Sequence, residues 1–276
     1  MSSLERRLPR EALRWELPVV CLLAWLGFIG IPLAEGAIGL SWDALNHHIY
    51  LGWVAQEPRF DRDLFAAGGQ AYQYPYLYWP VYKMAVMGWS GVWAGVALAS
   101  LHLVTVPPVW MLARLCMPGA TVFDALMRAM AVAMAFMTGV VLSQFDSTSN
   151  DLMAAAPLVW CLALALVPLD ANRPSWFTPA RSVALSGLLA GASIAFKLSN
   201  GPLVLVAMPL AWLLASPGAI GKRILLVALG CAMTMLGLCL VYASWGLALW
   251  QEFGNPIYPF YDGHFAPIRE AAGWKR

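Results

Sequence analysis

Apolar residues dominate seven stretches of the chain, and polar residues gather between them. The runs cover residues 17–33, 84–115, 122–142, 152–167, 183–196, 203–214 and 224–250. A bilayer core of about 30 Å takes about 20 apolar residues of helix, so such runs predict membrane-spanning helices. The pattern therefore predicts an all-α integral membrane protein with about seven transmembrane helices in one domain, residues 1–276.

The second run, residues 84–115, is longer than one crossing requires. We expect a short interfacial helix before Ser90, and a kink further along at Pro107 and Pro108, because proline inside a helix removes a hydrogen bond.

Composition agrees with a membrane protein, since 61% of the residues are hydrophobic and only 12% are charged. Such a chain has too little polar surface for a soluble globule of its size. The 14 Trp and nine Tyr residues can form belts at both membrane interfaces. The five cysteines lack CxxC or CxxH spacing, so neither zinc nor a disulfide framework is indicated. The net charge of +2 is nearly neutral, and no nucleic-acid partner is expected.

Basic residues predict the orientation, because Lys and Arg in short loops stay on the cytoplasmic side. Ten of the 17 basic residues fall before the first run or in alternate loops: Arg6, Arg7, Arg10, Arg14, Arg114, Arg128, Arg173, Arg181, Lys222 and Arg223. This places residues 1–16 in the cytoplasm, and a large first loop (34–80) and the tail (251–276) outside. A signal peptide is the alternative for the first run, with a loose cleavage site at residues 34–36, but the run is longer than the apolar core of such peptides.

Acidic residues gather on the outer side. Ten of the 15 lie there: Glu35, Asp43, Glu57, Asp61, Asp63, Asp146, Asp151, Glu252, Asp262 and Glu270. A cluster of carboxylates facing one compartment suggests a functional site.

The first outer loop carries Asp43, His47 and Tyr50, which share one face if this segment is helical. A partly desolvated carboxylate on that face could abstract a hydroxyl proton, or could bind a divalent ion. The residues alone favour a simpler interpretation, an interfacial helix with Ser41 as its N-cap and Asp43 at the positive end of the helix dipole.

Residues 72–80 are an aromatic segment broken by prolines, which predicts a non-helical stretch along the interface. Its rings could stack on sugars, although an ordinary interfacial belt is the favoured interpretation. The tail after residue 250 contains Gly254, Pro256 and Pro259, so it must leave the helix, and its aromatic residues should face the first loop.

Three further residues are candidates. Asp151 begins an apolar helix after Asn150, which is ordinary capping by itself. Lys197 ends an apolar helix at the outer surface, where its ammonium could bind a lipid-linked phosphate; snorkelling to phospholipid headgroups explains it equally well. His102 lies inside the second run, where a neutral histidine bonded to a neighbouring helix is favoured over a functional one.

Four segments together resemble bacterial polytopic membrane glycosyltransferases of the GT-C class. They are DALNHHIY at residues 43–50, SND at 149–151, GLLAG at 187–191 with KLSN at 197–200, and GNP at 254–256 with PFY at 259–261. Each motif is short, but their order and common outer location span nearly the whole chain.

The resemblance implies a multi-pass protein of the cell inner membrane whose site faces the periplasm. It implies transfer of a sugar from a polyprenyl-phosphate donor to a glycan or lipid acceptor, with Asp43 as general base. Lys197 or His48 would neutralise the leaving phosphate, and Asp151 would bind acceptor or metal. His47, Tyr50 and Asn255 complete the expected substrate-binding set. No cofactor is required by this scheme, although a divalent metal at Asp43 and Asp151 is compatible with it.

Many members of that class continue into further helices and a soluble domain, so the seven predicted helices resemble the shared core of a minimal or truncated member. A noncatalytic subunit with a membrane protein partner is therefore one alternative. A lipid or solute transporter is the other, but it would need polar groups at the membrane midplane and usually an internal repeat. Neither is evident, since His102 is the only histidine within a run and no acidic residue lies in the middle of one.

Overall fold

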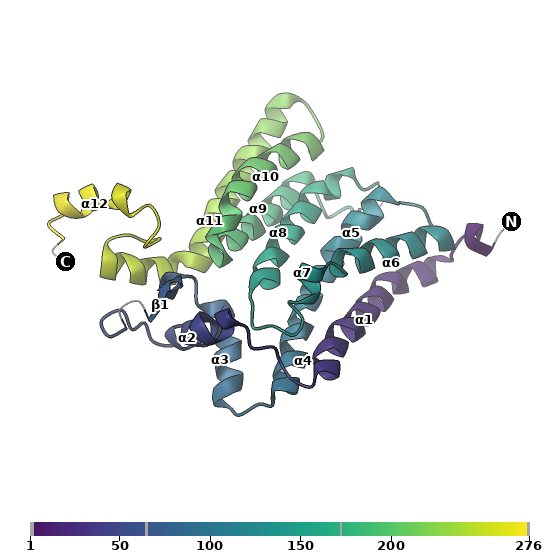
Figure 1. The fold of residues 1–276 in the computed structure, drawn as a ribbon. Coiled ribbons are helices and arrows are strands. Elements are labelled where there is room, and N and C mark those ends of the chain that lie inside the picture. Colours follow the sequence, from purple (N-terminus) through teal and green to yellow (C-terminus); the bar gives the residue numbers. More distant parts are fainter. Residues whose placement is uncertain (1–2, 64–65, 172, 275–276) are drawn as a thin grey trace.

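Helices make up most of the chain in the computed structural model, which describes residues 3–63, 66–171 and 173–274 (Figure 1). The longer helices are α1 (Arg10–Glu35), α4 (Gly91–Leu101), α5 (Val106–Cys116), α6 (Val122–Phe136), α8 (Asp151–Leu166), α9 (Pro179–Phe196), α10 (Gly201–Ala215) and α11 (Ile220–Phe253). The shorter helices are α2 (Ile49–Val54), α3 (Trp79–Val86), α7 (Gly139–Leu142) and α12 (Asp262–Ala271), and a four-residue strand, β1, covers Ala66–Gly69. A π-helical turn (Ala44–His48) precedes α2, and 3-10 turns occupy Ser3–Glu5, Gln70–Tyr72, Tyr76–Tyr78, His102–Thr105, Val167–Leu169 and Leu198–Asn200.

Six helical segments within the described ranges are long and apolar enough to cross a membrane. They are Arg10–Glu35, Gly91–Cys116, Asp151–Leu169, Pro179–Phe196, Leu198–Ala215 and Ile220–Phe253. Their outer faces carry large apolar side chains, including Leu23, Leu214 and Leu240, which are 61%, 74% and 71% exposed. Soluble proteins rarely expose so much apolar surface to water, so these helices indicate a multi-pass membrane protein.

The expected short helix before Ser90 is confirmed as α3. Ser90 then caps α4, because its side chain accepts a hydrogen bond from the Trp93 amide at 3.4 Å. The break further along lies at the 3-10 turn His102–Thr105, and Pro107 and Pro108 fall in the first turn of α5. Proline is tolerated there because the first N–H groups of a helix have no intrahelical partner.

The third predicted span, residues 122–142, differs from expectation. It forms α6, of 15 residues, and the separate four-residue α7. Thr138 starts the second helix by accepting a hydrogen bond from the Val141 amide at 3.4 Å. At 1.5 Å per residue, α6 is about 22 Å long, which is less than the usual hydrocarbon core. The six longer segments are therefore accompanied by one shorter helix of the bundle.

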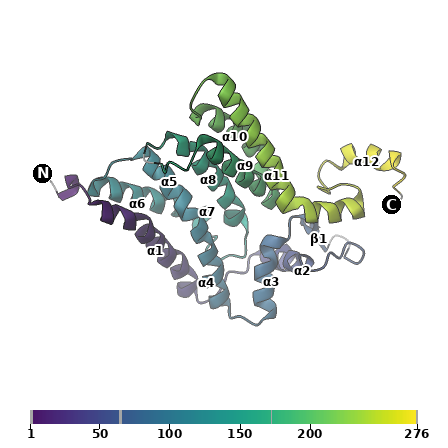
Figure 2. The same ribbon diagram turned by 180° about the vertical axis from the view of Figure 1, so that it is seen from behind.

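The loops that connect the helices lie at two ends of the bundle (Figures 1 and 2). The loop end contains the first loop (residues 36–63 and 66–90), residues 143–150 and the turn after α11. The basic end contains residues 114–121, 170–171, 173–178 and 216–223, with the start of α1. An ion pair between Asp151, at the start of α8, and Lys197, at the end of α9, places both helix ends at the loop end. The loops that the charge pattern assigns to opposite sides thus lie at opposite ends of the bundle, and the side of the membrane that each end faces stays a prediction.

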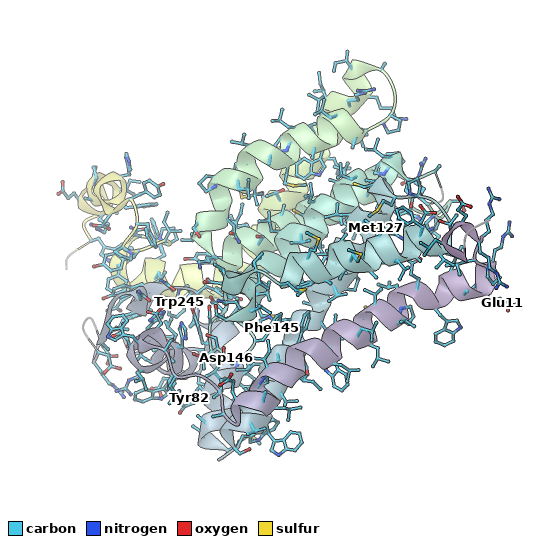
Figure 3. All side chains as sticks on the ribbon, turned by 45° about the vertical axis from the view of Figure 1, so that its right-hand side comes forward. Glu11, Tyr82, Met127, Phe145, Asp146 and Trp245 are labelled. Carbon is cyan, nitrogen blue, oxygen red and sulfur yellow. The ribbon has the colours of Figure 1, made fainter. Side chains whose placement is uncertain are left out.

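Two apolar cores hold the bundle together. One lies among α8, α9, α10 and α11 around Trp212, which is 1% exposed and donates from Nε1 to Ser186 Oγ at 2.9 Å. The other joins α1 to α5 and α6 through Val20, Phe28 and Phe136. A third, aromatic cluster packs the first loop against α11, with Trp245 at its centre (Figure 3).

Glycines allow α9 and α11 to pack closely. Gly187 and Gly191 lie one turn apart on α9, and a Cβ on Gly187 would come 2.5 Å from the Gly230 carbonyl oxygen. A Cβ on Gly191 would overlap the Thr234 carbonyl oxygen, and one on Gly237 would overlap that of Leu188. The GLLAG segment thus has a packing role, as small residues do in close helix contacts within membranes.

Gly191→Ala is expected to destabilise the protein by about 2–3 kcal/mol, since the added methyl group forces two helix backbones apart. The apparent melting temperature of the purified chain in mild detergent measures this. Gly221→Ala is the matched control, because Gly221 is also helical and a Cβ there meets nothing within 4 Å. Equal melting temperatures for the two variants would contradict the packing role.

A buried ion pair joins α1 to α6. The Arg128 side chain is 2% exposed and the Glu16 side chain is 9% exposed; Arg128 Nε and Nη2 donate to the two Glu16 oxygens at 2.5 and 2.7 Å. Arg128 Nη1 also donates to the carbonyls of Met117 and Gly119, and Trp110 Nε1 donates to Glu16 at 3.0 Å. Arg128 is therefore satisfied inside the protein rather than lying in a loop.

Candidate functional site

A polar cavity of about 330 Å³ opens at the loop end of the bundle. Its walls come from the first loop, the start of α8, the end of α9 and one residue of α11. The lining residues are Asp43, His47, His48, Gln70, Tyr72, Gln73, Tyr74, Tyr78, Ser149, Asn150, Asp151, Ala195, Phe196, Lys197, Leu198, Ser199, Tyr242 and Phe260. Five of the seven predicted site residues, Asp43, His47, His48, Asp151 and Lys197, thus lie around one cavity.

A π-helical turn sets the direction of the two histidines. It spans Ala44–His48 and carries the chain directly into α2. Gly52, one turn further on, lets α2 approach the first-loop backbone, because a Cβ there would come 2.5 Å from the Tyr78 carbonyl oxygen. The His48 ring stacks on the Tyr78 ring with centroids 4.7 Å apart. Turns of the π type occur often at functional sites, where they redirect side chains.

The His48 side chain is held by a hydrogen bond to Thr148 and by stacking on the Tyr78 ring. Its Nδ1 shares a hydrogen bond of 2.7 Å with Thr148 Oγ1, and the side chain is 4% exposed. Burial, followed by the neighbouring His47, lowers the pKa of His48 to about 4. The imidazole is therefore neutral at neutral pH, when it can donate one hydrogen bond and accept another.

His47 and Asp43 form the predicted pair at positions i and i+4. His47 Nδ1 lies 3.7 Å from Asp43 Oδ1, which is too far for a direct hydrogen bond. Among the described residues this nitrogen has no hydrogen-bond partner, although His47 is only 4% exposed. Burial lowers the pKa of His47, against the opposing effect of Asp43. A buried, unpartnered nitrogen is uncommon, and here it belongs to a side chain that lines the cavity beside a carboxylate.

Asp43 itself is open to the cavity, with 53% of its side chain exposed. A carboxylate with that exposure can receive a proton from a bound hydroxyl without first breaking a direct hydrogen bond to His47.

Lys197 forms an ion pair with Asp151 across the cavity wall. The side chains are 44% and 53% exposed, so the pair is accessible to water and to ligands. Exposed pairs of this kind contribute little to stability. An anion entering the cavity could therefore compete with Asp151 for the lysine.

Aromatic rings form the rest of the wall. Tyr74 stacks near Tyr242 of α11 with centroids 6.1 Å apart, and Phe196 of α9 lies 5.8 Å from Tyr74. Burial raises the pKa of Tyr74 to about 12, so its hydroxyl stays protonated. Tyr78 is 3% exposed, whereas Trp79 is 43% exposed. The predicted aromatic belt is thus divided, with some rings in the cavity wall and others on the outer surface.

Two predicted residues lie outside the cavity wall. Tyr50 packs 6.5 Å from Trp53 and hydrogen-bonds with Asp63, and burial raises its pKa to about 12. The i+7 spacing places it with Asp43 only in a regular α-helix, and the π turn changes that register.

Asn255 is fully buried and stabilises the turn after α11. Its Nδ2 donates to the Phe260 carbonyl and to Asp262, both at 3.1 Å, and its Oδ1 accepts from the Ile257 amide at 3.0 Å. These bonds satisfy the side chain within the tail, and Asn255 does not line the cavity.

The expected contact between the tail and the first loop is confirmed. The Tyr258 ring lies 4.8 Å from that of Tyr72, and Phe253 lies 5.3 Å from Phe60. Trp245 Nε1 donates to the Tyr72 carbonyl at 3.0 Å. These contacts hold the aromatic wall in place.

His102 lies away from the cavity. It is 2% exposed, hydrogen-bonds with the Gln144 backbone and packs 5.5 Å from the Phe145 ring. His102 is therefore a buried histidine, and its partner lies in the turn after α7 rather than in a neighbouring helix. Figure 3 shows Phe145 and Asp146 beside α1, where the Gly39 amide donates to the Asp146 carbonyl at 2.5 Å.

Thr148, Tyr78 and Tyr242 were not predicted as site residues. The sequence could have indicated Thr148, which lies in the polar run before Asp151, and Tyr78, which lies in the aromatic segment at residues 72–80. Tyr242 had none, because it lies inside an apolar run and reaches the cavity only through the packing of α11.

No three His, Cys, Asp or Glu side chains in the described ranges are placed to hold a metal ion together. Asp43 and Asp151 both face the cavity, and Asp151 is already paired with Lys197. A divalent ion held by these two carboxylates would need further oxygen ligands from a bound substrate, such as phosphate oxygens.

The helices and the cavity together describe a multi-pass membrane protein with a polar, aromatic-lined site at one end of its bundle. Comparison with known proteins adds no relative: no family model, no curated protein and no solved structure matches the chain.

Proposed function

We propose that this protein is a membrane glycosyltransferase of the GT-C type, which moves a sugar from a polyprenyl-phosphate donor to an acceptor outside the cytoplasm. One observation supports this most: an open carboxylate, an exposed lysine and tyrosine rings share one cavity where apolar helices end. A lipid-linked sugar phosphate has matching parts, since its polyprenyl chain suits the bilayer and its phosphate and sugar suit the cavity.

In this proposal Asp43 accepts the proton of the acceptor hydroxyl. The acceptor oxygen then bonds to the anomeric carbon, and the bond from that carbon to the phosphate oxygen breaks, leaving its electron pair on the phosphate. His47 lies 3.7 Å from Asp43 and would hold the acceptor or the carboxylate through its unpartnered nitrogen. A positioned base contributes about 10²- to 10⁴-fold to such a reaction.

Lys197 would bind the phosphate. Its ion pair with Asp151 is exposed, so exchange of the carboxylate for a phosphate costs little. The ammonium would then stabilise the charge that develops on the leaving phosphate. Asp151, once released, would face the acceptor. The acidic side of the bundle would face the periplasm, with the basic end in the cytoplasm, so the site would lie on the outer face of the cell inner membrane.

Lys197→Met is expected to weaken binding of polyprenyl phosphate by about 10- to 100-fold, because a hydrogen bond to a charged group is worth about 1.5–3 kcal/mol. The measurement is titration of the purified chain in detergent with a fluorescent polyprenyl phosphate. Lys83→Met is the matched control, because Lys83 is also at the loop end but lies 5.6 Å over the Trp79 ring, away from the cavity. Binding by Lys197→Met within twofold of the wild type would reject the phosphate-binding role.

A further inference from the structure

A second cavity, of about 320 Å³, lies at the opposite, basic end of the bundle. It is formed by the last turns of α5, the end of α8 and the connection to α9. Trp110, Leu115, Leu166 and Phe177 are among its apolar lining residues. The proposed transferase reaction uses no part of it.

The cavity lies where three candidate spans end. Gly91–Cys116 ends on one side of it, Asp151–Leu169 ends on the other, and Pro179–Phe196 begins just beyond it. Leu115 and Leu166 come from the spans, whereas Asp170 and Arg173 come from the connecting loop. The lining therefore changes from apolar to charged where the candidate spans end, as a site at the boundary between lipid hydrocarbon and headgroups requires.

Two arginines supply positive charge there. The Arg114 guanidinium lies 5.3 Å from the Trp110 ring centroid, and Arg173 Nη1 donates to the Pro168 and Asp170 carbonyls at 3.0 and 3.3 Å. Neither arginine forms an ion pair with any residue that the structure describes. Arg181 lies close by, donating to the Trp176 carbonyl at 2.8 Å.

Several cations at the loop end, by contrast, have carboxylate partners. Arg59 pairs with Asp63, Lys197 with Asp151, and Arg269 with Asp262. The one carboxylate in the lining of the second cavity, Asp170, is outnumbered by the arginines. The arginines keep a surplus of positive charge that a negatively charged ligand can balance.

We propose that this cavity binds one anionic phospholipid, with the phosphate between Arg114 and Arg173 and an acyl chain against Leu115 and Leu166. A soluble anion would use the arginines alone and gain nothing from the apolar lining. A zwitterionic phospholipid would use the lining but would bring its own cation to the arginines. Basic cavities between membrane helices are a known setting for anionic headgroups.

The test is a competition between phosphatidylglycerol and phosphatidylcholine with the same acyl chains. Native mass spectrometry of the full chain counts the molecules of each lipid that stay bound. The wild type should retain phosphatidylglycerol preferentially. Arg114→Gln/Arg173→Gln should reduce that preference at least tenfold, since each arginine near an anionic headgroup contributes about fivefold. Lys222→Gln/Arg223→Gln, at the same end but outside the cavity, should keep it. Leu115→Trp, which fills the cavity and retains both arginines, should also lose bound lipid.

Three results would overturn the proposal. Equal retention of the two lipids by the wild type would by itself reject the site. Equal losses in the two double variants would mean that general positive charge, rather than this cavity, attracts the lipid. Displacement of the lipid by an equal concentration of soluble glycerol 3-phosphate would assign the cavity to a free anion. If the arginine double variant does not fold, the wild-type competition and Leu115→Trp decide the outcome.

Discussion

Replacing Asp43 with asparagine is expected to reduce sugar transfer by about 10²- to 10⁴-fold. Asparagine keeps the size and polarity of the side chain but cannot accept the proton of the acceptor hydroxyl. Binding of polyprenyl phosphate should stay within twofold of the wild type, because Lys197 is unchanged. The measurement is the initial rate of labelled sugar transfer from polyprenyl phosphate in proteoliposomes.

Asp61→Asn provides the control for that experiment. Asp61 is an acid of the same loop, is 65% exposed, pairs with Arg62 and does not line the cavity. Its substitution should leave transfer unchanged. A wild-type rate for Asp43→Asn would remove Asp43 as the base, and equal losses for both variants would attribute the effect to loop charge.

Arg128→Met is expected to destabilise the protein by about 3–5 kcal/mol, the usual result of removing one partner of a buried ion pair. The change leaves Glu16 buried without its cation and leaves the Met117 and Gly119 carbonyls without a donor. Denaturation of the purified chain in detergent measures the loss. Sugar transfer by the surviving folded fraction should be normal, because the pair lies at the basic end.

A second substitution separates the ion pair from simple packing. Glu16→Leu/Arg128→Met replaces both charges by apolar side chains and should recover much of the stability, since apolar residues can substitute for a buried pair. If the double variant is as unstable as the sum of the two single variants, the unpaired charge is not the cause of the loss.

Much of the fold follows from the apolar runs alone. A long helix in lipid must satisfy every backbone group internally, so an apolar run of sufficient length predicts a spanning helix. The α6 segment shows where this reasoning stops. Its run continues past Phe136, but Thr138 caps a new helix, and an uninterrupted apolar pattern hides that boundary.

The positions of basic residues in the sequence indicated which loops share an end of the bundle, but they did not indicate which charged side chains are buried inside it. Arg128 counts toward the basic loops by its place in the sequence, yet it is buried against Glu16 of α1. The sequence does not predict that these two residues pair, because 112 positions separate them. Only the approach of α6 to α1 brings them together.

The candidate site was predictable where spacing is local. Asp43 and His47 are four residues apart and lie close, as helical spacing requires. The prediction that Tyr50 shares a face with Asp43 assumed a regular α-helix, and the π turn moves Tyr50 off that face. The partners Thr148 of His48 and Asp151 of Lys197 depend on contacts between distant segments, which spacing along the chain does not encode.

The most direct test of the proposed site is a structure of the full chain in nanodiscs with bound polyprenyl phosphate. The proposal predicts phosphate density within ~3 Å of Lys197 Nζ, with the Lys197–Asp151 pair opened and Asp43 facing the ligand. Phosphate density elsewhere, with Lys197 still paired to Asp151, would contradict it.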